Sequence, residues 1–581
     1  MESEPAKAHD LAHHPVALLL SILLALLLWI PLIKAAYPAD LPFTDINLQT
    51  DLSFYPRSIT TEYLKSIHLD VAAIPEYGRI EEVTVVYSNT IIACTGTTYR
   101  SKEGQLRYCG AFKVLPNLAP GRYPVTVALK YTKKGMTHAF GEIEIMKRSI
   151  PRPANPRRDL LHAIALDGSP PPRKGNDIEI LYDGPDAFHM WKKVLSRAQR
   201  RINLQTYYLE YSEKCKELVQ ILKEKAQQGI EVNLLVTRYS QIAIAPFAIW
   251  DLRKHGIHVI VVGEIGFPDQ NNDTSQFWLD KMRRNYRILD SLPQTPAFAG
   301  WIKEKGNDLT VDFAPHEKML IVDDAWAIAG GRNISDRYFM WWIDTDVYLE
   351  GPIVGDVKEA FEKNWKEFGG AIASLSPQSI PSTGNNRTTV QLIHSKPWDN
   401  RYCTLDMICN AMNAARHRIY LTSQYLALPP RLEKTLVDAA ARGVDVRLLT
   451  NSYETGREVA FSLGHFISLN YYRPLLRAGV RLYEYRGKTN GEKRQPYIHA
   501  KQCIIDGSLV SIGSFNFSIR SAYLESEVMI NVYDPAIAAS QERLFLHMLK
   551  KADQTTLFNL ARKEDDFGLL INLARRIEIL Y

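Results

Sequence analysis

A short pattern of residues able to act on a phosphate group occurs twice in this chain. Each copy has a histidine, a lysine two positions later, an aspartate five positions after the lysine and an asparagine ten positions after the aspartate. These residues are His316, Lys318, Asp323 and Asn333 in the first copy, and His499, Lys501, Asp506 and Asn516 in the second. Two copies at identical spacing in an otherwise divergent chain indicate a shared chemical role.

The residue types suit the cleavage of a phosphodiester through a phosphohistidine. Such a reaction needs a nucleophile that works near neutral pH and an acid for the leaving alkoxide, and histidine can do either job. The lysines supply positive charge and the asparagines supply neutral donors, so the phosphoryl oxygens can be stabilised without a metal. We therefore expect one histidine to attack phosphorus and the other to protonate the leaving group, with no cofactor.

The spacing also brings the reactive side chains together. Residues two apart on a strand face the same side, so the histidine and lysine of each motif can reach one phosphate. The apolar residues 319–322 and 502–505 predict strands that enter a core. Asp323 and Asp506 fall on the opposite strand face, so we expect them to serve a turn or a polar contact between the two halves.

The double motif resembles the hallmark of the phospholipase D superfamily, His-x-Lys-x4-Asp. Residues 180–550 are similar to its cardiolipin synthase branch, and the similar blocks are residues 330–339, 449–452 and 472–480 and the Arg520-Ser521 pair before Glu527. The resemblance implies a metal-free phosphatidyltransferase with His316 as nucleophile and His499 as acid, and an active site between two halves. A phospholipase D hydrolase would use the same residues with water as acceptor, and a membrane-tethered nuclease is a less favoured alternative.

The internal repeat extends beyond the motifs. Residues 201–208 match 418–425, residues 229–235 match 443–449, and helical patterns cover residues 215–228 and 431–442. Each half reads strand, helix, strand, helix, catalytic strand, which is typical of an α/β sheet with both faces covered. The predicted fold is α/β, with two phospholipase D-like halves related by pseudo-twofold symmetry, preceded by a transmembrane segment and a small immunoglobulin-like β-sandwich.

A pair of carboxylates follows each motif on the next predicted strand. Asp344-Thr345-Asp346 parallels Glu525-Ser526-Glu527. A carboxylate that accepts one imidazole N–H would set the tautomer and stabilise the imidazolium. By register the candidates are Asp346 and Glu527, and Asp344 can serve in place of Asp346.

The composition changes along the chain define the expected domains. Short β-branched strands bounded by turns predict the β-sandwich, and Pro-, Arg-, Ser- and Gly-rich stretches predict linkers. The expected boundaries are an N-terminal tail and anchor at 1–37, the β-sandwich at 38–148, a linker at 149–174, the first half at 175–373, a linker at 374–390, the second half at 391–560 and a C-terminal helix at 561–581.

Residues 16–33 are almost all aliphatic and favour an uncleaved single-pass anchor over a cleaved signal peptide. The expected partners are a phospholipid substrate and the bilayer, with the catalytic domains outside the cytoplasm. The net charge of +6 is mild, and we expect no nucleic acid. The partner of the β-sandwich is not predicted.

Two further segments mix aromatic and basic residues. Residues 269–305 can contact the bilayer or form a locally packed helix and loop, and residues 338–342 are expected in the core. The basic residues of 147–172 can lie on anionic headgroups or serve only as a soluble linker.

Six cysteines leave two arrangements open. Disulfides can join Cys94 to Cys109 and Cys403 to Cys409, which would suit an extracytoplasmic domain. The alternative is six free thiols.

Overall fold

The structure is a computed structural model. It describes the strands between residues 52 and 145 and short pieces at 160–170. It then describes residues 169–237, 240, 246–262, 314–372, 388–399, 401–458, 462–487 and 496–576. The predicted anchor at residues 1–37 and the aromatic insertion at residues 269–305 lie outside the described residues. Among the described helices, none is long and apolar enough to cross a membrane.

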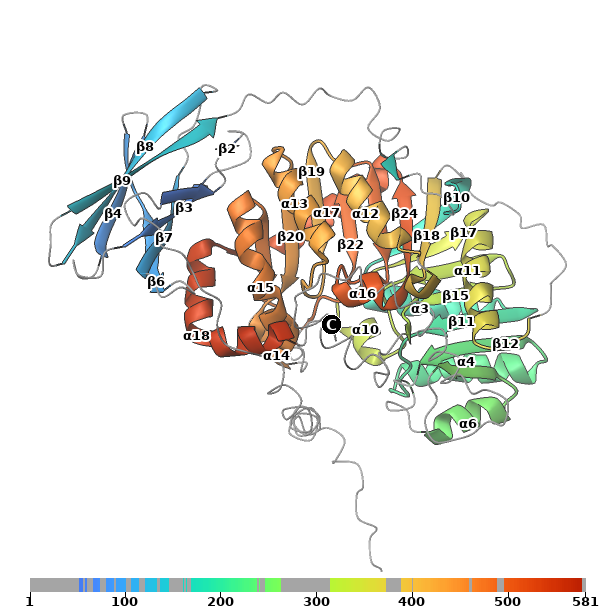
Figure 1. Cartoon of the computed structure of the whole chain (residues 1–581). Helices are drawn as coiled ribbons and strands as arrows, with labels where there is room; N and C mark the ends of the chain where they lie inside the picture. The colour runs from blue at the N-terminus through green and yellow to red at the C-terminus, as the bar shows by residue number, and fades with distance from the viewer. Residues whose placement is uncertain are drawn as a thin grey trace, which may run out of the picture.

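The N-terminal domain consists of two β-sheets around one core (Figure 1). Apolar side chains that alternate along the strands, such as Leu69, Val71, Val83 and Val85, point into the space between the sheets and are almost fully buried. One sheet has the order β1 (Leu52–Tyr55), β3 (Ser66–Ala72), β7 (Leu106–Lys113) and β6 (Thr95–Arg100). The other has the order β2 (Ser58–Ile59), β9 (Met136–Ile145), β8 (Gly121–Tyr131), β4 (Ile80–Tyr87) and β5 (Thr90–Ala93).

The rest of the chain is built on one continuous mixed sheet, in which the strand order of the second half mirrors that of the first. From its outer edge, the first half runs β13 (His258–Val262), β12 (Glu231–Thr237), β11 (Arg201–Thr206), β15 (Met319–Val322), β16 (Trp326–Gly330), β17 (Asp346–Glu350) and β10 (Arg173–Leu181). The second half continues with β18 (Thr388–Ser395), β24 (Glu525–Tyr533), β23 (Leu509–Gly513), β22 (Gln502–Ile505), β19 (Arg418–Thr422), β20 (Asp445–Asn451), β21 (Arg481–Tyr485) and β25 (Ala552–Thr555). The halves join where β10 pairs with β18, so the pseudo-twofold relation runs through the centre of the sheet.

Helices cover both faces of this sheet, because strands such as β11, β15, β22 and β24 bury side chains on both sides. One face packs against α3 (Gly184–Ser196), α4 (Cys215–Gln227), α6 (Pro246–Lys254), α12 (Cys403–Ala414), α13 (Pro430–Ala441), α15 (Ser462–Ala478) and α18 (Leu557–Arg576). The other face packs against α11 (Ile353–Glu367) and α17 (Pro535–Leu549). The helices predicted at 215–228 and 431–442 are confirmed as α4 and α13.

Three sequence predictions differ from the structure. A further strand, β13 or β21, follows the second helix of each half, and the repeat analysis missed it. The second half begins at β18 from Thr388, three residues before the predicted boundary at 391. The strands predicted at 319–322 and 502–505 are confirmed as β15 and β22, but each His-x-Lys segment precedes its strand and is not part of it.

The motif aspartates belong to turns and not to the group of reactive side chains. Asp323 has a φ of 55°, and its carboxylate accepts the backbone N–H groups of Gln199, Arg200 and Arg201 at 2.8–2.9 Å. Asp506 repeats this arrangement with a φ of 51° and three N–H donors at 2.8 Å, from the residues before and at the start of β19. Aspartate suits both tasks, because it tolerates the left-handed conformation and accepts several hydrogen bonds. The expectation of a turn role is therefore right, and an inter-half contact is not what these residues make.

Replacing Asp506 with alanine should destabilise the fold by about 3 kcal/mol, because three hydrogen bonds to a charged acceptor are lost and alanine is strained at this φ. Thermal or urea unfolding of the full chain measures this loss. Asp506→Asn is the control, because asparagine keeps one acceptor and tolerates the conformation, so it should recover part of the stability. An unchanged unfolding midpoint in the alanine variant would contradict the structural role.

The described cysteines are all free thiols. Cys403 and Cys409, predicted as a pair, are both unbridged on α12, and Cys94 is also free. The side chain of Cys109 lies outside the described residues. Of the two arrangements left open by the sequence, the described cysteines agree with free thiols and not with the two bridges, and burial raises the pKa of the Cys94 thiol to about 12.

Candidate active site

The two motif segments meet because each one docks on the opposite half. β14 (Ala314–Pro315), just before His316, pairs with β24 of the second half, and the His316 backbone N–H donates to Ser526 at 3.0 Å. The His499 backbone N–H donates to the carbonyl of Ile343 in the first half at 2.8 Å. The pseudo-twofold sheet therefore brings both motifs to the junction of the halves.

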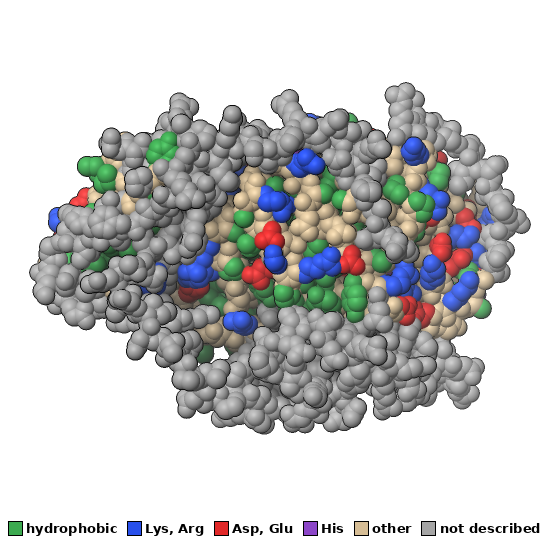
Figure 2. Space-filling model, turned by 45° about the horizontal axis from the view of Figure 1, so that its top comes forward, with side chains coloured by type: hydrophobic (Ala, Val, Ile, Leu, Met, Phe, Trp, Pro, Cys, Tyr) green, Lys and Arg blue, Asp and Glu red, His purple; other side chains and the backbone are tan. Residues whose placement is uncertain are grey.

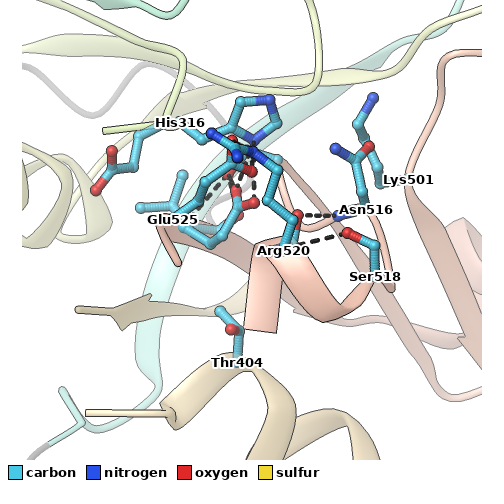
Figure 3. A network of polar contacts seen from close by, with 12 residues as sticks. His316, Thr404, Lys501, Asn516, Ser518, Arg520 and Glu525 are labelled. Carbon is cyan, nitrogen blue, oxygen red and sulfur yellow. Dashed lines mark hydrogen bonds and ion pairs between the residues drawn. The ribbon is translucent and has the colours of Figure 1, made fainter. Parts of the chain in front are cut away.

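The carboxylates are exchanged between the halves in the same way. The Nδ1 of His316 lies 3.0 Å from the Oε1 of Glu527, which comes from the second half. The Nδ1 of His499 lies 2.6 Å from the Oδ2 of Asp344, which comes from the first half. Figure 3 shows His316 over Glu525 and Arg520, with the Lys501 and Asn516 side chains to one side. Each imidazole can thus donate a hydrogen bond from its Nδ1–H to a carboxylate and present Nε2 to a substrate.

The prediction that Asp346 holds a catalytic imidazole is wrong, and Asp344, the stated alternative, takes this place. Asp346 instead accepts from the buried Arg332, through the guanidinium at 2.8 Å and the backbone N–H at 3.1 Å. In the sheet Gly330 pairs with Asp346, whereas its counterpart Gly513 pairs with Met529. Asp344 is therefore the equivalent of Glu527, and the predicted register was shifted by two residues.

Burial and mutual charge set the protonation of the site. Burial, reinforced by the motif lysines, lowers the pKa of both His316 and His499 to about 3. Burial also lowers the pKa of Lys318 to about 8 and that of Lys501 to about 7. The Nζ of Lys501 lies 3.0 Å from the Nε2 of His499. Before a phosphate anion arrives, both imidazoles are neutral and the lysine charges are easily lost.

The partner carboxylates differ in charge. Although burial opposes ionisation, the hydrogen bond with the His499 imidazole and the charges of Lys501 and Arg332 hold the pKa of Asp344 below its ordinary value. Burial raises the pKa of Glu527 to about 7, with Lys318 and the Ser514 hydroxyl acting against it. Asp344 therefore stabilises an imidazolium at His499 more strongly than Glu527 does at His316.

We expect kcat/KM for an anionic phosphodiester to fall as pH rises above about 8. The lysines have lowered pKa values in the free enzyme, so they lose their charge there, and neutral amines bind an anion poorly. A bound phosphate raises both lysine pKa values, so the alkaline limb of kcat should lie at higher pH than that of kcat/KM. Steady-state rates from pH 6 to 10 test this, and a kcat/KM that stays flat to the alkaline end would contradict it.

The asparagines of both motifs are buried, and Asn516 lies near Lys501 (Figure 3). One N–H of the Asn333 amide donates to the Tyr338 hydroxyl at 3.0 Å, and within the described part of the chain the side-chain oxygens of Asn333 and Asn516 have no hydrogen-bond partner. The structure therefore brings together His316, Lys318, Asn333, His499, Lys501, Asn516, Glu527 and Asp344.

Aromatic rings enclose the imidazoles, and the sequence analysis did not identify them as part of the site. The Tyr207 ring lies edge-on to His316 with centroids 4.8 Å apart. Tyr338 lies edge-on to His499 at 4.9 Å, and Trp342 stacks on His499 at 5.8 Å. Residues 338–342 were expected in the core, and Tyr338 and Trp342 are buried, but they pack against a reactive side chain.

Glu317, between the first motif's histidine and lysine, was also missed. It is fully buried and accepts from the Nε2 of His394 on β18 at 2.8 Å, as well as from Gln205 and Asn364. The second motif has Ala500 in this position. Glu317 thus ties the first motif to β18, the strand of the second half that lies at the junction of the halves.

One group of side chains in the described residues has the composition of a metal site. Ligand atoms of His316, Glu525 and Glu527 all lie within 4.8 Å of one another. The Arg520 Nε donates to Glu525 at 2.7 Å, and Lys318 contributes positive charge at Glu527. The carboxylate charge is therefore already balanced by protein cations, and we assign this group to the orientation of His316.

Comparisons with known proteins agree with this geometry. Residues 191–365 and 408–549, more than half of the chain, match a family model described as "Cardiolipin synthase, PLD-like domain". The chain is 26% identical over 489 residues to cardiolipin synthase A of Pseudomonas syringae pv. syringae (strain B728a), covering 80% of this chain and 88% of that protein. It is 29% identical over 364 residues to cardiolipin synthase 2 of Bacillus anthracis, covering 61% of each.

Among solved structures, a phosphatidylserine synthase from Haemophilus influenzae Rd KW20 is similar, with a TM-score of 0.48 and 12% identity over 74% of this chain and all of that one. The family match spans both halves and includes both His-Lys motifs. The chain therefore belongs to the phospholipase D-like family of the cardiolipin synthase type.

Proposed function

We propose that this protein is a membrane-anchored phosphatidyltransferase that makes cardiolipin from glycerophospholipids through a phosphohistidine. The observation that carries the proposal is the pair of buried His-Lys motifs, each with its imidazole on a carboxylate from the opposite half. The names of the relatives and the family model support lipid as the substrate class. The apolar residues 16–33 support the anchor. In this proposal the β-sandwich is of immunoglobulin type, and it lies outside the cytoplasm together with the catalytic halves.

The mechanism divides the work between the histidines. The Nε2 of His316 attacks the phosphorus of a phosphatidyl donor, the bond from phosphorus to the headgroup oxygen breaks, and His499 gives that oxygen its proton. His499, now neutral, takes the proton of the acceptor hydroxyl, whose oxygen attacks phosphorus and displaces His316. Asp344 favours this assignment, because it stabilises the imidazolium that His499 must form.

Lys318 and Lys501 would hold the phosphoryl oxygens, and the phosphate anion would raise the low histidine pKa so that His499 can carry a proton. The reacting side chains are buried, with His316 and His499 only 6% and 7% exposed. A site that excludes water favours transfer to an alcohol over hydrolysis. The same residues would support a phospholipase D if water reached the intermediate.

The charges on one described face of the molecule do not favour a nuclease. On the face shown in Figure 2, Lys and Arg side chains are interspersed with Asp and Glu side chains. A nuclease for single strands needs a basic groove with stacking aromatics.

Lipid mass spectrometry of the purified protein in phosphatidylglycerol vesicles tests the proposal, with His499→Ala as the control. Cardiolipin and glycerol formed only by the intact enzyme are the expected result. Phosphatidic acid without cardiolipin would make the protein a hydrolase. If folded protein leaves the lipid unchanged, the lipid assignment is wrong.

A further inference from the structure

The repeat places an arginine four residues after each motif asparagine, and the two arginines have different surroundings. Arg520, in the second half, is buried, and its Nε donates to Glu525 at 2.7 Å. Arg337, in the first half, has a side chain that is 36% exposed, and its Nη2 lies 3.9 Å from the Oε1 of Glu210. The charge of Arg520 is therefore balanced inside the protein, whereas that of Arg337 is held weakly at the rim of the site.

Arg337 lies on the His499 side of the site. Its guanidinium carbon is 5.4 Å from the centre of the Trp342 ring, and Trp342 in turn stacks on His499. The next residue, Tyr338, lies edge-on to His499. One aromatic layer thus separates an accessible guanidinium from the imidazole that would deprotonate the acceptor. Figure 1 shows α10 (Asp336–Met340), which carries Arg337, at the edge of the sheet where the halves meet.

The proposed reaction needs a second place for a phosphate. The donor phosphate occupies the two motifs, but an acceptor that is itself an anionic phospholipid brings another phosphodiester, one short headgroup away from its reacting hydroxyl. When that hydroxyl lies on His499, its phosphate must lie a few atoms further out on the same side. A guanidinium suits this position, because it binds phosphate oxygens in bidentate fashion and keeps its charge at all relevant pH.

We propose that Arg337 binds the phosphate of the acceptor lipid and so selects an anionic phospholipid as acceptor. This inference rests on the proposed function. Glu210 competes for the guanidinium, although it is also held by the hydroxyl of Ser335. The ion pair is long and solvent-exposed, so an incoming phosphate can replace it.

The experiment measures how the phosphohistidine intermediate is shared between two acceptors, phosphatidylglycerol and glycerol. The full chain is given phosphatidylglycerol vesicles and isotope-labelled glycerol, and the ratio of cardiolipin to labelled phosphatidylglycerol is followed by mass spectrometry. Both products come from the same donor step, so a change in folding or donor binding cancels in the ratio. Arg337→Gln should lower the ratio about tenfold, because a charged hydrogen bond to the anionic acceptor is lost and glycerol has no phosphate.

Three further variants sharpen the result. Arg337→Lys should recover part of the ratio, because it keeps the charge without the planar fork. Glu210→Gln should raise the ratio, because the competing carboxylate is removed. Arg197→Gln is the matched control, since Arg197 also lies over a tryptophan, Trp326, at 5.1 Å, outside the residues of the site, and it should change nothing.

An Arg337→Gln ratio equal to that of the unmodified enzyme would overturn the inference. A fall that Arg197→Gln reproduces would also overturn it. If the unmodified enzyme labels phosphatidylglycerol but makes no cardiolipin, the proposed function itself fails, which is a different result from an unchanged ratio.

Discussion

Replacing His316 with alanine should reduce phosphatidyl transfer by about 10⁴-fold or more, and His499→Ala should do the same with natural lipid donors. Without His316 no phosphohistidine forms, and without His499 the leaving alkoxide receives no proton. Both side chains are buried beside their partner carboxylates, so water cannot readily take over either task. Initial rates of product formation in lipid vesicles measure the loss.

The two variants should differ in their release of the leaving group when that group no longer needs a proton. With a phosphatidyl nitrophenol donor, His499→Ala should release one equivalent of nitrophenolate at a rate within about tenfold of the unmodified enzyme and then stall. His316→Ala should release none. Near-normal turnover of natural lipid in either variant would rule out the two-histidine mechanism, and a burst in His316→Ala alone would reverse the roles.

Replacing Asp344 with asparagine should lower kcat by about 10³- to 10⁴-fold, as expected when the acceptor of an imidazole N–H is neutralised. The Nδ1 of His499 lies 2.6 Å from this carboxylate, and asparagine can favour the wrong tautomer and cannot stabilise the imidazolium. The unfolding midpoint should change little, because the amide can keep a hydrogen bond. Rates and thermal unfolding are measured on the same preparation.

Asp346→Asn is the matched control, because this carboxylate lies two residues away and holds the buried Arg332. It should cost about 3 kcal/mol of stability, since a buried guanidinium loses its counter-ion, while the activity of the folded fraction stays within about tenfold. The account of the carboxylates would be wrong if Asp346→Asn lost activity at unchanged stability. It would equally be wrong if Asp344→Asn kept normal activity.

The sequence predicted those parts of the fold and site that depend on local pattern. The spacing of the motifs identified the residues that meet in the structure, and the apolar runs after them gave the bounds of β15 and β22. Matching segments in the two halves predicted the repeated α/β architecture, which the strand order of the sheet repeats. Such features are encoded within a few residues, so a single sequence can reveal them.

The carboxylate partners could not be predicted with the same success, because they depend on contacts between halves. The predicted register aligned Asp346 with Glu527, but the sheet pairs Gly330 with Asp346 and Gly513 with Met529, so Asp344 is the equivalent of Glu527. His316 and His499 are 183 positions apart, and so are Asp344 and Glu527, so this signal in the sequence could have been used.

The aromatic residues at His499 illustrate another limit of the sequence. A run such as residues 338–342 is equally consistent with a core and with the wall of a site, because both bury apolar rings. The contact that decides between a core and a site wall is made between the halves, where the His499 backbone N–H donates to the carbonyl of Ile343. The sequence left the state of Cys403 and Cys409 open for a similar reason, since closeness in sequence on a helix does not by itself bring two thiols into bonding geometry, and both are free.

We expect a phosphohistidine to form on the first half, while the second half supplies its carboxylate and its acid. The most direct measurement is peptide mapping of the covalent intermediate after an alkaline quench, with a nitrophenyl phosphatidyl donor and the His499→Ala variant. We expect a phosphatidyl adduct on the peptide that contains His316. An adduct found only on the His499 peptide of His316→Ala, or an active enzyme that forms no adduct, would contradict the account.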